Sequence, residues 1–272
     1  MPGERTVQDA DGLTSVVFRW PAPAPQAGVQ ILHGWCEHAL RYDRLANQLA
    51  AAGFSVYADD HRGHGQSGVR SGTLGDLGPR GMAGVVDAVH AVSGMIRAED
   101  PGRPLFVLGH SWGSFILQEY LRRWGGDIDG ALLTGTTRPD PSATIAAPAA
   151  DAPAPRTAYD WLSRDDAEVD KYIADPLCGF DVMANVPATE LFSLLEGDDS
   201  NIPTTLPVFI FNGADDPVGG EAGGRRLFEH YQALGLTDVS FRAYPGARHE
   251  LFNETNRDEV VADVLEWLSG HL

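Results

Sequence analysis

The sequence predicts an α/β fold with a mostly parallel central sheet, because short apolar runs alternate with amphipathic stretches along most of its 272 residues. Hydrophobic residues make up 43% of the chain and charged residues 21%, a balance that allows a soluble globular domain with a sizeable core. This length suits one α/β domain that carries a modest insertion. We therefore expect helices to cover both faces of a single sheet.

The first half of the chain contains strands and helices in alternation. Short runs rich in β-branched or aromatic residues predict strands at 14–20, 29–32, 54–58, 103–109 and 131–135. Amphipathic stretches predict helices at 42–53, 81–99 and 114–125. In the first helix Leu45, Leu49 and Ala52 share one face, and Gly53 is a stop signal. We expect the first strand to be an outer one and the second an inner one.

The alternation stops near residue 136 and resumes near residue 206. Its last elements are the strands 206–213 and 239–244 and the helices 221–235 and 256–272. The segment between begins with a Pro/Ala-rich stretch, 137–156, whose composition favours extended backbone. Apolar residues then recur at roughly helical intervals from Tyr159 to Leu195, which predicts a small helical insertion. The expected organisation is a core of 1–135 and 206–272 with an insertion at 136–205.

The charge balance argues against nucleic acid as a partner. Asp plus Glu number 38 against 20 Lys plus Arg, so the formal net charge is −18 and the summed field repels phosphate backbones. The N-terminus lacks the basic start and apolar core of a targeting peptide, and no run approaches the ~18–20 apolar residues that span a bilayer. We expect a cytoplasmic protein without a membrane segment, in which Cys36 and Cys178 are reduced thiols.

Residues 109–113 carry the most specific chemical motif. Gly109-His110-Ser111-Trp112-Gly113 fits the pattern G-x-S-x-G and lies between an expected strand and an expected helix, as that pattern requires. In such a tight turn the serine occupies the strained apex, and side chains at the two glycine positions would clash. We expect Ser111 to be a nucleophile rather than only a cap of the helix that follows.

A serine nucleophile needs a base, and the base needs an acid that orients it. With this type of turn the chain order is serine, acid, histidine. One expected strand runs into Asp215 and Asp216, and open α/β sheets place their sites at the carboxyl ends of strands, so one of these carboxylates is the expected acid. His249 follows the last expected strand and is the expected base. The amides of Trp35 and Trp112 are the expected donors to the oxyanion.

Five segments carry a family resemblance. They are His33-Gly34-x-x-Glu37-His38 with Arg41-Tyr42, Asp60-His61-Arg62-Gly63-His64-Gly65-x-Ser67, Gly109-His110-Ser111-x-Gly113, Gly213-Ala214-Asp215-Asp216-Pro217-Val218-Gly219, and Tyr244-Pro245-Gly246-Ala247-Arg248-His249-Glu250. Together they resemble the α/β-hydrolase family, and within it the monoacylglycerol lipase and lysophospholipase-like group. The resemblance covers nearly the whole chain except 137–156. It implies an α/β-hydrolase fold, and in the family's acid motif the catalytic aspartate corresponds to Asp216.

The resemblance also implies an activity and a lid. The activity is hydrolysis of carboxylic acyl esters, such as monoacylglycerols, lysophospholipids or simple acyl esters, through an acyl-enzyme formed by Ser111 with the help of His249 and Asp216. Relatives place a lid over the serine, so the insertion 136–205 is the expected lid. Four of its apolar side chains are candidates for the wall of an acyl-chain pocket or for ordinary packing: Trp161, Leu177, Phe180 and Phe192.

Other functions stay open beside ester hydrolysis. The same chemistry serves acyltransferases and aminopeptidases, although solvated helix charges explain the lid carboxylates better than a site for a substrate amine does. A fold that only binds has no physical need for a nucleophile, an acid, a base and an oxyanion loop together. No cofactor is expected, and the family's turns explain the loop histidines without a metal: His33, His38, His61 and His64. The expected partner is an acyl ester or lipid, and the sequence indicates no oligomeric state.

Overall fold

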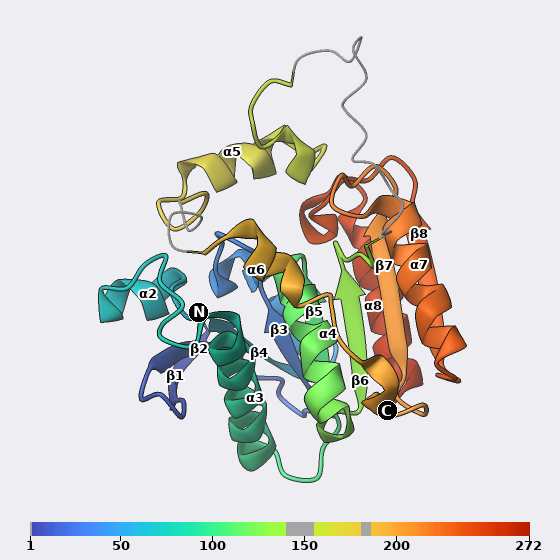
Figure 1. The fold of residues 1–272 in the computed structure, drawn as a ribbon, viewed down its shortest axis with the longest axis horizontal. Helices are drawn as coiled ribbons and strands as arrows, with labels where there is room; N and C mark the ends of the chain where they lie inside the picture. The colour runs from blue at the N-terminus through green and yellow to red at the C-terminus, as the bar shows by residue number, and fades with distance from the viewer. Residues whose placement is uncertain (1, 140–154, 181–185) are drawn as a thin grey trace.

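Eight strands form one sheet in the order β1-β2-β4-β3-β5-β6-β7-β8 (Figure 1). This arrangement comes from a computed structural model, which describes residues 2–139, 155–180 and 186–272. The strands are β1 (Gly3–Gln8), β2 (Thr14–Trp20), β3 (Ala27–Leu32), β4 (Phe54–Asp60), β5 (Leu105–His110), β6 (Gly130–Thr134), β7 (Val208–Gly213) and β8 (Val239–Tyr244). β2 pairs antiparallel with β1 and β4, whereas all other pairs are parallel. The mostly parallel sheet expected from the sequence is confirmed.

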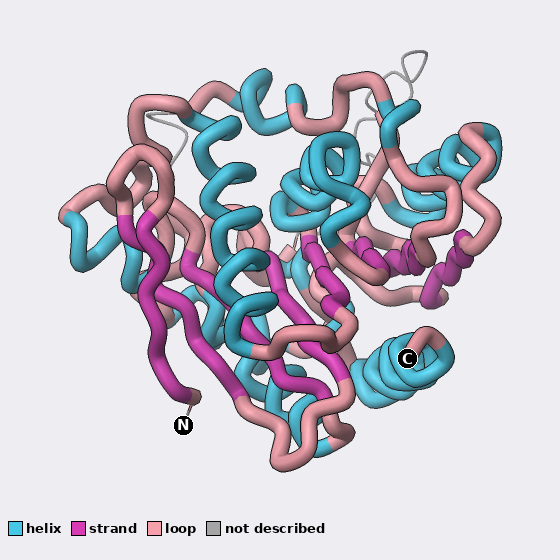
Figure 2. Tube along the Cα trace, turned by 90° about the horizontal axis from the view of Figure 1, so that it is seen from below, coloured by secondary structure: helices cyan, strands magenta, loops and turns pink. Residues whose placement is uncertain are grey.

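Helices cover both faces of this sheet, as expected. They are α1 (Asp43–Ala51), α2 (Gly65–Ser71), α3 (Gly81–Glu99), α4 (Trp112–Trp124), α5 (Asp166–Ala174), α6 (Ala188–Ser193), α7 (Gly220–Ala233) and α8 (Arg257–Gly270). Side chains of α3, α4 and α7 belong to one apolar core, and those of α1 and α8 to a second core on the opposite face. Figure 2 shows from below how the sheet twists between its two helical layers. Every residue of β3 to β7 is buried, because both faces are covered.

Two elements of the core were not expected from the sequence. Strand β1 is almost entirely exposed, so it has no apolar alternation to reveal it, and its backbone pairing with β2 holds it in place. Helix α2 contains two glycines and a serine pair, which are poor helix formers. The carboxylate of Asp60 accepts a hydrogen bond from the amide of Gln66 at 2.6 Å, so a tertiary contact starts this helix.

The segment between β6 and β7 lies across the carboxyl edge of the sheet. Its described parts contain η3 (Asp160–Leu162), α5, α6 and η4 (Asp199–Asn201), and Figure 1 shows α5 above the strand ends. Most of the Pro/Ala-rich stretch, 140–154, lies outside the described residues. Two backbone hydrogen bonds tie η3 to the loop after β8: His249 N to Trp161 O at 3.4 Å and Glu250 N to Leu162 O at 2.7 Å. Among the described residues, no helix is long and apolar enough to cross a bilayer.

Candidate active site

Ser111 occupies a sharp turn between β5 and α4. Its φ of 53° and ψ of −122° are strained for a residue with a side chain. A Cβ atom at Gly109 would lie 2.5 Å from the carbonyl oxygen of Gly113, and one at Gly113 would overlap the carbonyl of Leu32. The two glycines of the motif are therefore required by close backbone packing, and they present the serine at the end of β5.

His249 and Asp216 form a buried pair at the ends of β8 and β7. His249 Nδ1 donates to Asp216 Oδ2 at 2.9 Å, and the amide of Val218 donates to Asp216 Oδ1 at 2.8 Å. The other carboxylate of this motif, Asp215, is exposed to solvent. The protonated Nδ1 leaves Nε2 as the ring nitrogen that is able to accept a proton.

The electrostatics of this pair favour an ionised acid beside a basic histidine. Burial acts to lower the pKa of His249, but the charge and hydrogen bond of Asp216 outweigh it, and the pKa is raised above 6.5. Burial likewise acts to raise the pKa of Asp216, but His249 and the Val218 amide outweigh it, and that pKa is lowered. Asp216 is therefore negatively charged at neutral pH, where it holds the imidazole in one tautomer.

A cavity of about 380 Å³ joins Ser111 and His249. From the core it is lined by these two residues and by the loop after β3, including Trp35. From the insertion it is lined mainly by aromatic and apolar side chains: Tyr159, Trp161, Leu162, Tyr172 and Phe180. The indole of Trp161 lies against His249, with ring centroids 4.9 Å apart. The cavity thus has the reacting groups on its floor and an apolar cover.

The structure brings only two of the four expected wall residues to this cavity. Trp161 and Phe180 line it, whereas Leu177 and Phe192 do not. Phe192 is 47% exposed and faces Phe115 on α4, with ring centroids 6.1 Å apart. Two tyrosines that sequence reasoning missed, Tyr159 and Tyr172, complete the wall instead, although both fall within the stretch predicted as helical insertion.

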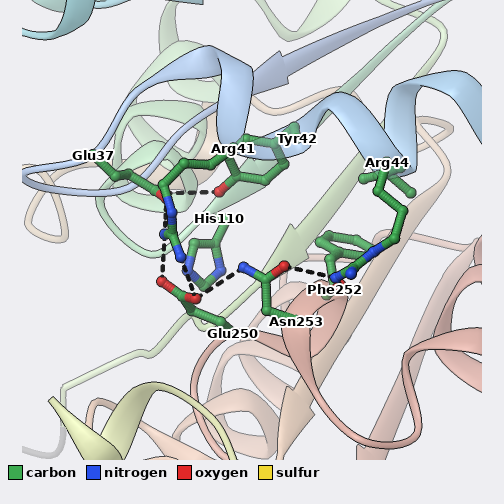
Figure 3. A pocket seen from close by; sticks show the side chains of 9 residues that line it. Glu37, Arg41, Tyr42, Arg44, His110, Glu250, Phe252 and Asn253 are labelled. Carbon is green, nitrogen blue, oxygen red and sulfur yellow. Dashed lines mark hydrogen bonds and ion pairs between the residues drawn. The ribbon is translucent and has the colours of Figure 1, made fainter. Parts of the chain in front are cut away.

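A buried charge network lies beside this cavity, as Figure 3 shows, and two of its members, Glu37 and Glu250, also line the cavity. Arg41 donates to both carboxylate oxygens of Glu250, at 2.6 and 2.7 Å, and it also contacts Glu37. Glu37 accepts hydrogen bonds from Tyr42 Oη at 2.8 Å and from the amide of Gly34 at 2.5 Å. The resemblance singled out Glu37 and Arg41, but their link to Glu250 joins positions 209 residues apart and could not be read from spacing.

This network fixes the loop after β3 beside the serine. A Cβ atom at Gly34 would lie 3.2 Å from Ser111 Cβ, so the loop backbone passes close to the nucleophile. Because Glu37 already accepts the Gly34 amide, the amide of Trp35 is the next candidate donor along the loop. The indoles of Trp35 and Trp112 pack edge to face, with centroids 4.7 Å apart. The two expected oxyanion donors thus come from neighbouring backbone segments.

The buried ionisable groups around the cavity divide into charged and neutral sets. Burial acts to raise the pKa of Glu37, but Arg41 and the donors to its carboxylate outweigh this and lower it, so it is ionised. Burial and the nearby His249 lower the pKa of His110 to about 4, so its ring is neutral. The His110 and His249 rings lie 4.7 Å apart.

The other loop histidines have structural partners. His33 Nε2 accepts the amide of His61 at 3.0 Å, and the two rings stack with centroids 4.0 Å apart. His64 Nε2 accepts the amide of Cys36 at 3.3 Å, and burial lowers its pKa to about 3. These backbone contacts occupy ring nitrogens that a metal would need. His38 differs, because its Nε2 faces the carboxylate of Asp175 in the insertion.

Known proteins were compared with this chain and its structure. A family model for Serine aminopeptidase, S33, matches residues 23–256. The monoacylglycerol lipase of Mycolicibacterium smegmatis is 31% identical over 99% of this chain and 98% of its own length, and the monoglyceride lipase of Mus musculus is 28% identical over 97% and 89%. The solved structure of a thermostable carboxyl esterase from Bacillus coagulans, in complex with glycerol, superposes with a TM-score of 0.87 at 25% identity over 99% of this chain and 98% of that one. The chain therefore belongs to the serine aminopeptidase (S33) family of α/β-hydrolases, in the group of monoacylglycerol lipase-like carboxylic ester hydrolases.

Proposed function

We propose that the protein hydrolyses acyl esters, monoacylglycerols in particular, with Ser111 as nucleophile, His249 as base and Asp216 as the acid that orients it. The observation that carries this proposal is the buried hydrogen bond of 2.9 Å between His249 and Asp216, in a site where His249 shares one cavity with the strained Ser111. Serine hydrolysis requires this combination of a presented hydroxyl, a neutral imidazole nitrogen and a buried carboxylate.

The proposed reaction proceeds in two steps. His249 Nε2 removes the proton of Ser111 while the serine oxygen attacks the acyl carbonyl, and the amides of Trp35 and Trp112 stabilise the oxyanion. His249 then returns the proton to the leaving alcohol, and a water molecule attacks the acyl-enzyme with His249 again as base. Asp216 stays ionised throughout and stabilises the imidazolium.

The two sides of the cavity suggest how an ester would lie in it. The aromatic cover, with Trp161, Tyr172 and Phe180, offers an apolar surface for the acyl chain. Glu37 and Glu250 also line the cavity and make that part of its surface polar, although Arg41 already occupies their carboxylates, and a polar surface suits a glycerol-like alcohol better than an acyl chain. This placement of the substrate explains why one wall is apolar and the other polar, and it favours a monoacylglycerol over an ester without a polar alcohol.

An aminopeptidase activity has weaker support. It needs a carboxylate that is available to hold a substrate amine, but Glu37 and Glu250, the two carboxylates at the cavity, are both paired with Arg41. The lid carboxylates are also engaged, since Asp165 pairs with Arg257 and Glu168 with Arg44. Ester hydrolysis therefore fits the described charges better than amine recognition does.

The test is steady-state hydrolysis of p-nitrophenyl esters of increasing chain length beside a monoacylglycerol, a lysophospholipid and an aminoacyl amide. We expect turnover of the monoacylglycerol that disappears in Ser111→Ala, while the folded state of this variant, followed by circular dichroism, is unchanged. Turnover of the amide but of no ester would contradict the proposed ester hydrolysis and would indicate an aminopeptidase instead. Residual ester turnover in Ser111→Ala would exclude the proposed nucleophile, and no turnover of any substrate would favour a binding module.

A further inference from the structure

One group of side chains outside the catalytic pair combines nitrogen, oxygen and sulfur ligands. His38 precedes the short helix η1 (Ala39–Tyr42) in the core, and Asp175 and Cys178 follow α5 in the insertion. His38 Nε2 lies 2.9 Å from Asp175 Oδ2, and one ligand atom from each of the three residues lies within 4.8 Å of the others. The chain thus brings together an imidazole, a carboxylate and a thiol from positions that no local motif connects.

These ligands match what Zn²⁺ takes in proteins. Zinc binds Cys, His and Asp in tetrahedral sites with bond lengths of about 2.0–2.3 Å, which places its ligands roughly 3.3–3.8 Å apart. The observed spacing, 2.9 Å for one pair and at most 4.8 Å for all three, brackets that range. A neighbouring hollow of about 380 Å³ is lined by His38 and Asp175, so two of the three ligands border open space.

The charges around the site balance one another apart from that of Asp175. Arg41 is the nearby positive group, but it is paired with two buried carboxylates, Glu37 and Glu250, so these three side chains together are net negative. Asp175 adds a further negative charge. Two cations at the rim of the hollow, Arg44 and Lys171, are both paired with Glu168. These three side chains carry one net positive charge, which cancels the net negative charge of the Arg41 group, so Asp175 alone gives the region its net negative charge.

We propose that His38, Asp175 and Cys178 form a Zn²⁺ site that fastens the insertion to the loop after β3. On binding, Cys178 loses its thiol proton to solvent and a zinc–sulfur bond forms. The next residue along the chain, Gly179, donates its amide to the carbonyl of Cys36 at 2.9 Å. Phe180 then lines the catalytic cavity. Zinc would thus immobilise one wall of the cavity and restrict the entry and exit of substrate.

This site also explains why the sequence predicts no metal. The four histidines of the two loops lack a carboxylate or cysteine at ligand spacing, and three of them have structural partners in the fold. The missing ligands come from the insertion, and 137 residues separate Asp175 from His38. Only the folded chain places them beside one another.

Cobalt spectroscopy of the full chain, after treatment with EDTA and dialysis, tests the site directly. Co²⁺ bound to a thiolate produces a sulfur-to-metal charge-transfer band, and we expect this band to saturate at one Co²⁺ per chain and to be displaced by Zn²⁺. It should be absent in Cys178→Ser, strongly weakened in Asp175→Asn and retained in the matched control Cys36→Ser. The absence of a band, or a band that survives in Cys178→Ser but not in Cys36→Ser, would overturn the proposal.

Two further measurements test whether zinc fastens the insertion. Zn²⁺ should raise the Tm of the wild-type protein and leave the Tm of Cys178→Ser unchanged, whereas Mg²⁺ should affect neither. Zn²⁺ should also lower ester turnover severalfold in the wild type, relative to the same protein in EDTA, but not in Cys178→Ser. Equal zinc sensitivity of both proteins would exclude this site as the cause. The cobalt band and the Tm do not depend on the substrate, so they distinguish failure of this inference from failure of the proposed function.

Discussion

At the scale of single residues, the two adjacent aspartates of the acid motif differ sharply. Asp216 is buried and accepts from His249, whereas Asp215 is exposed. We expect Asp216→Asn to lower kcat by about 10³–10⁴-fold, because an amide no longer stabilises the correct tautomer and the imidazolium. Asp215→Asn should change kcat less than about threefold. Steady-state kinetics of both variants check this ranking, and a larger loss in Asp215→Asn would move the acid to that position.

The raised pKa of His249 predicts how activity depends on pH. The ring must be neutral to accept the serine proton, so kcat/KM should rise with pH through the pKa of His249 in the free enzyme. Because Asp216 raises this pKa, the midpoint should lie above 6.5. Glu250 also raises it, and Glu250→Gln should therefore shift the midpoint downward. A pH–rate profile with an acid limb centred below 6.5 in the wild type would contradict this electrostatic account.

The candidate site was only partly predictable from the sequence. Ser111 and His249 were identified from motifs whose spacing reflects local backbone geometry, and the structure places both at one cavity. Leu177 and Phe192, candidates for the cavity wall or for ordinary packing, do not line this cavity, because apolar periodicity indicates burial or a helical face but not which surface a side chain contacts. Nothing in the order of residues could reveal that Glu250 shares a guanidinium with Glu37.

At the scale of elements, the guanidinium of Arg41 joins η1 (Ala39–Tyr42) to the loop after β8. Arg41→Met keeps most of the side-chain volume but leaves two buried carboxylates, Glu37 and Glu250, without their cation. Removing one partner of such a buried group costs about 3–5 kcal/mol, so we expect a loss of that size in the free energy of unfolding. Urea denaturation measures it, and Arg41→Lys should recover part of the loss. A loss below about 1 kcal/mol would show that the network contributes little to stability.

Elements were predictable from the sequence where burial imposes a pattern. β3, β5 and β7 are buried on both faces, so they appear as short, mostly apolar runs, and α4 shows one apolar face. β1 and α2 lack such patterns because an edge pairing and the carboxylate of Asp60 hold them. The apolar pattern that reveals an element in the sequence thus comes from its contact with the core. Elements that are held by polar contacts show no such pattern.

At the scale of the whole molecule, the buried histidines predict how stability depends on pH. Burial lowers the pKa of His64 to about 3, that of His110 to about 4 and that of His33 well below 6.5. Below pH 6.5 the unfolded chain binds protons at these positions that the folded chain does not, so stability falls as pH decreases from 6.5 toward 4. Each such group contributes a slope of up to about 1.4 kcal/mol per pH unit. His249 has the opposite sign, but the stability from its raised pKa is fully present below pH 6.5 and is lost only as pH rises above it, so it adds no opposing slope in this interval.

Self-repulsion among the surface charges acts against this trend, because a net charge of −18 at pH 7 becomes smaller as carboxylates are protonated. Salt at about 0.15 M screens exposed charges beyond roughly 8 Å, whereas buried histidines are hardly screened, so the histidines should dominate. We expect the free energy of unfolding in urea at 0.15 M NaCl to fall steadily between pH 6.5 and 4.5. His64→Gln, which removes one titrating ring, should reduce the slope whatever its effect on stability at pH 7.5. A flat or rising profile in the wild type would show that charge repulsion outweighs the burial of neutral histidines.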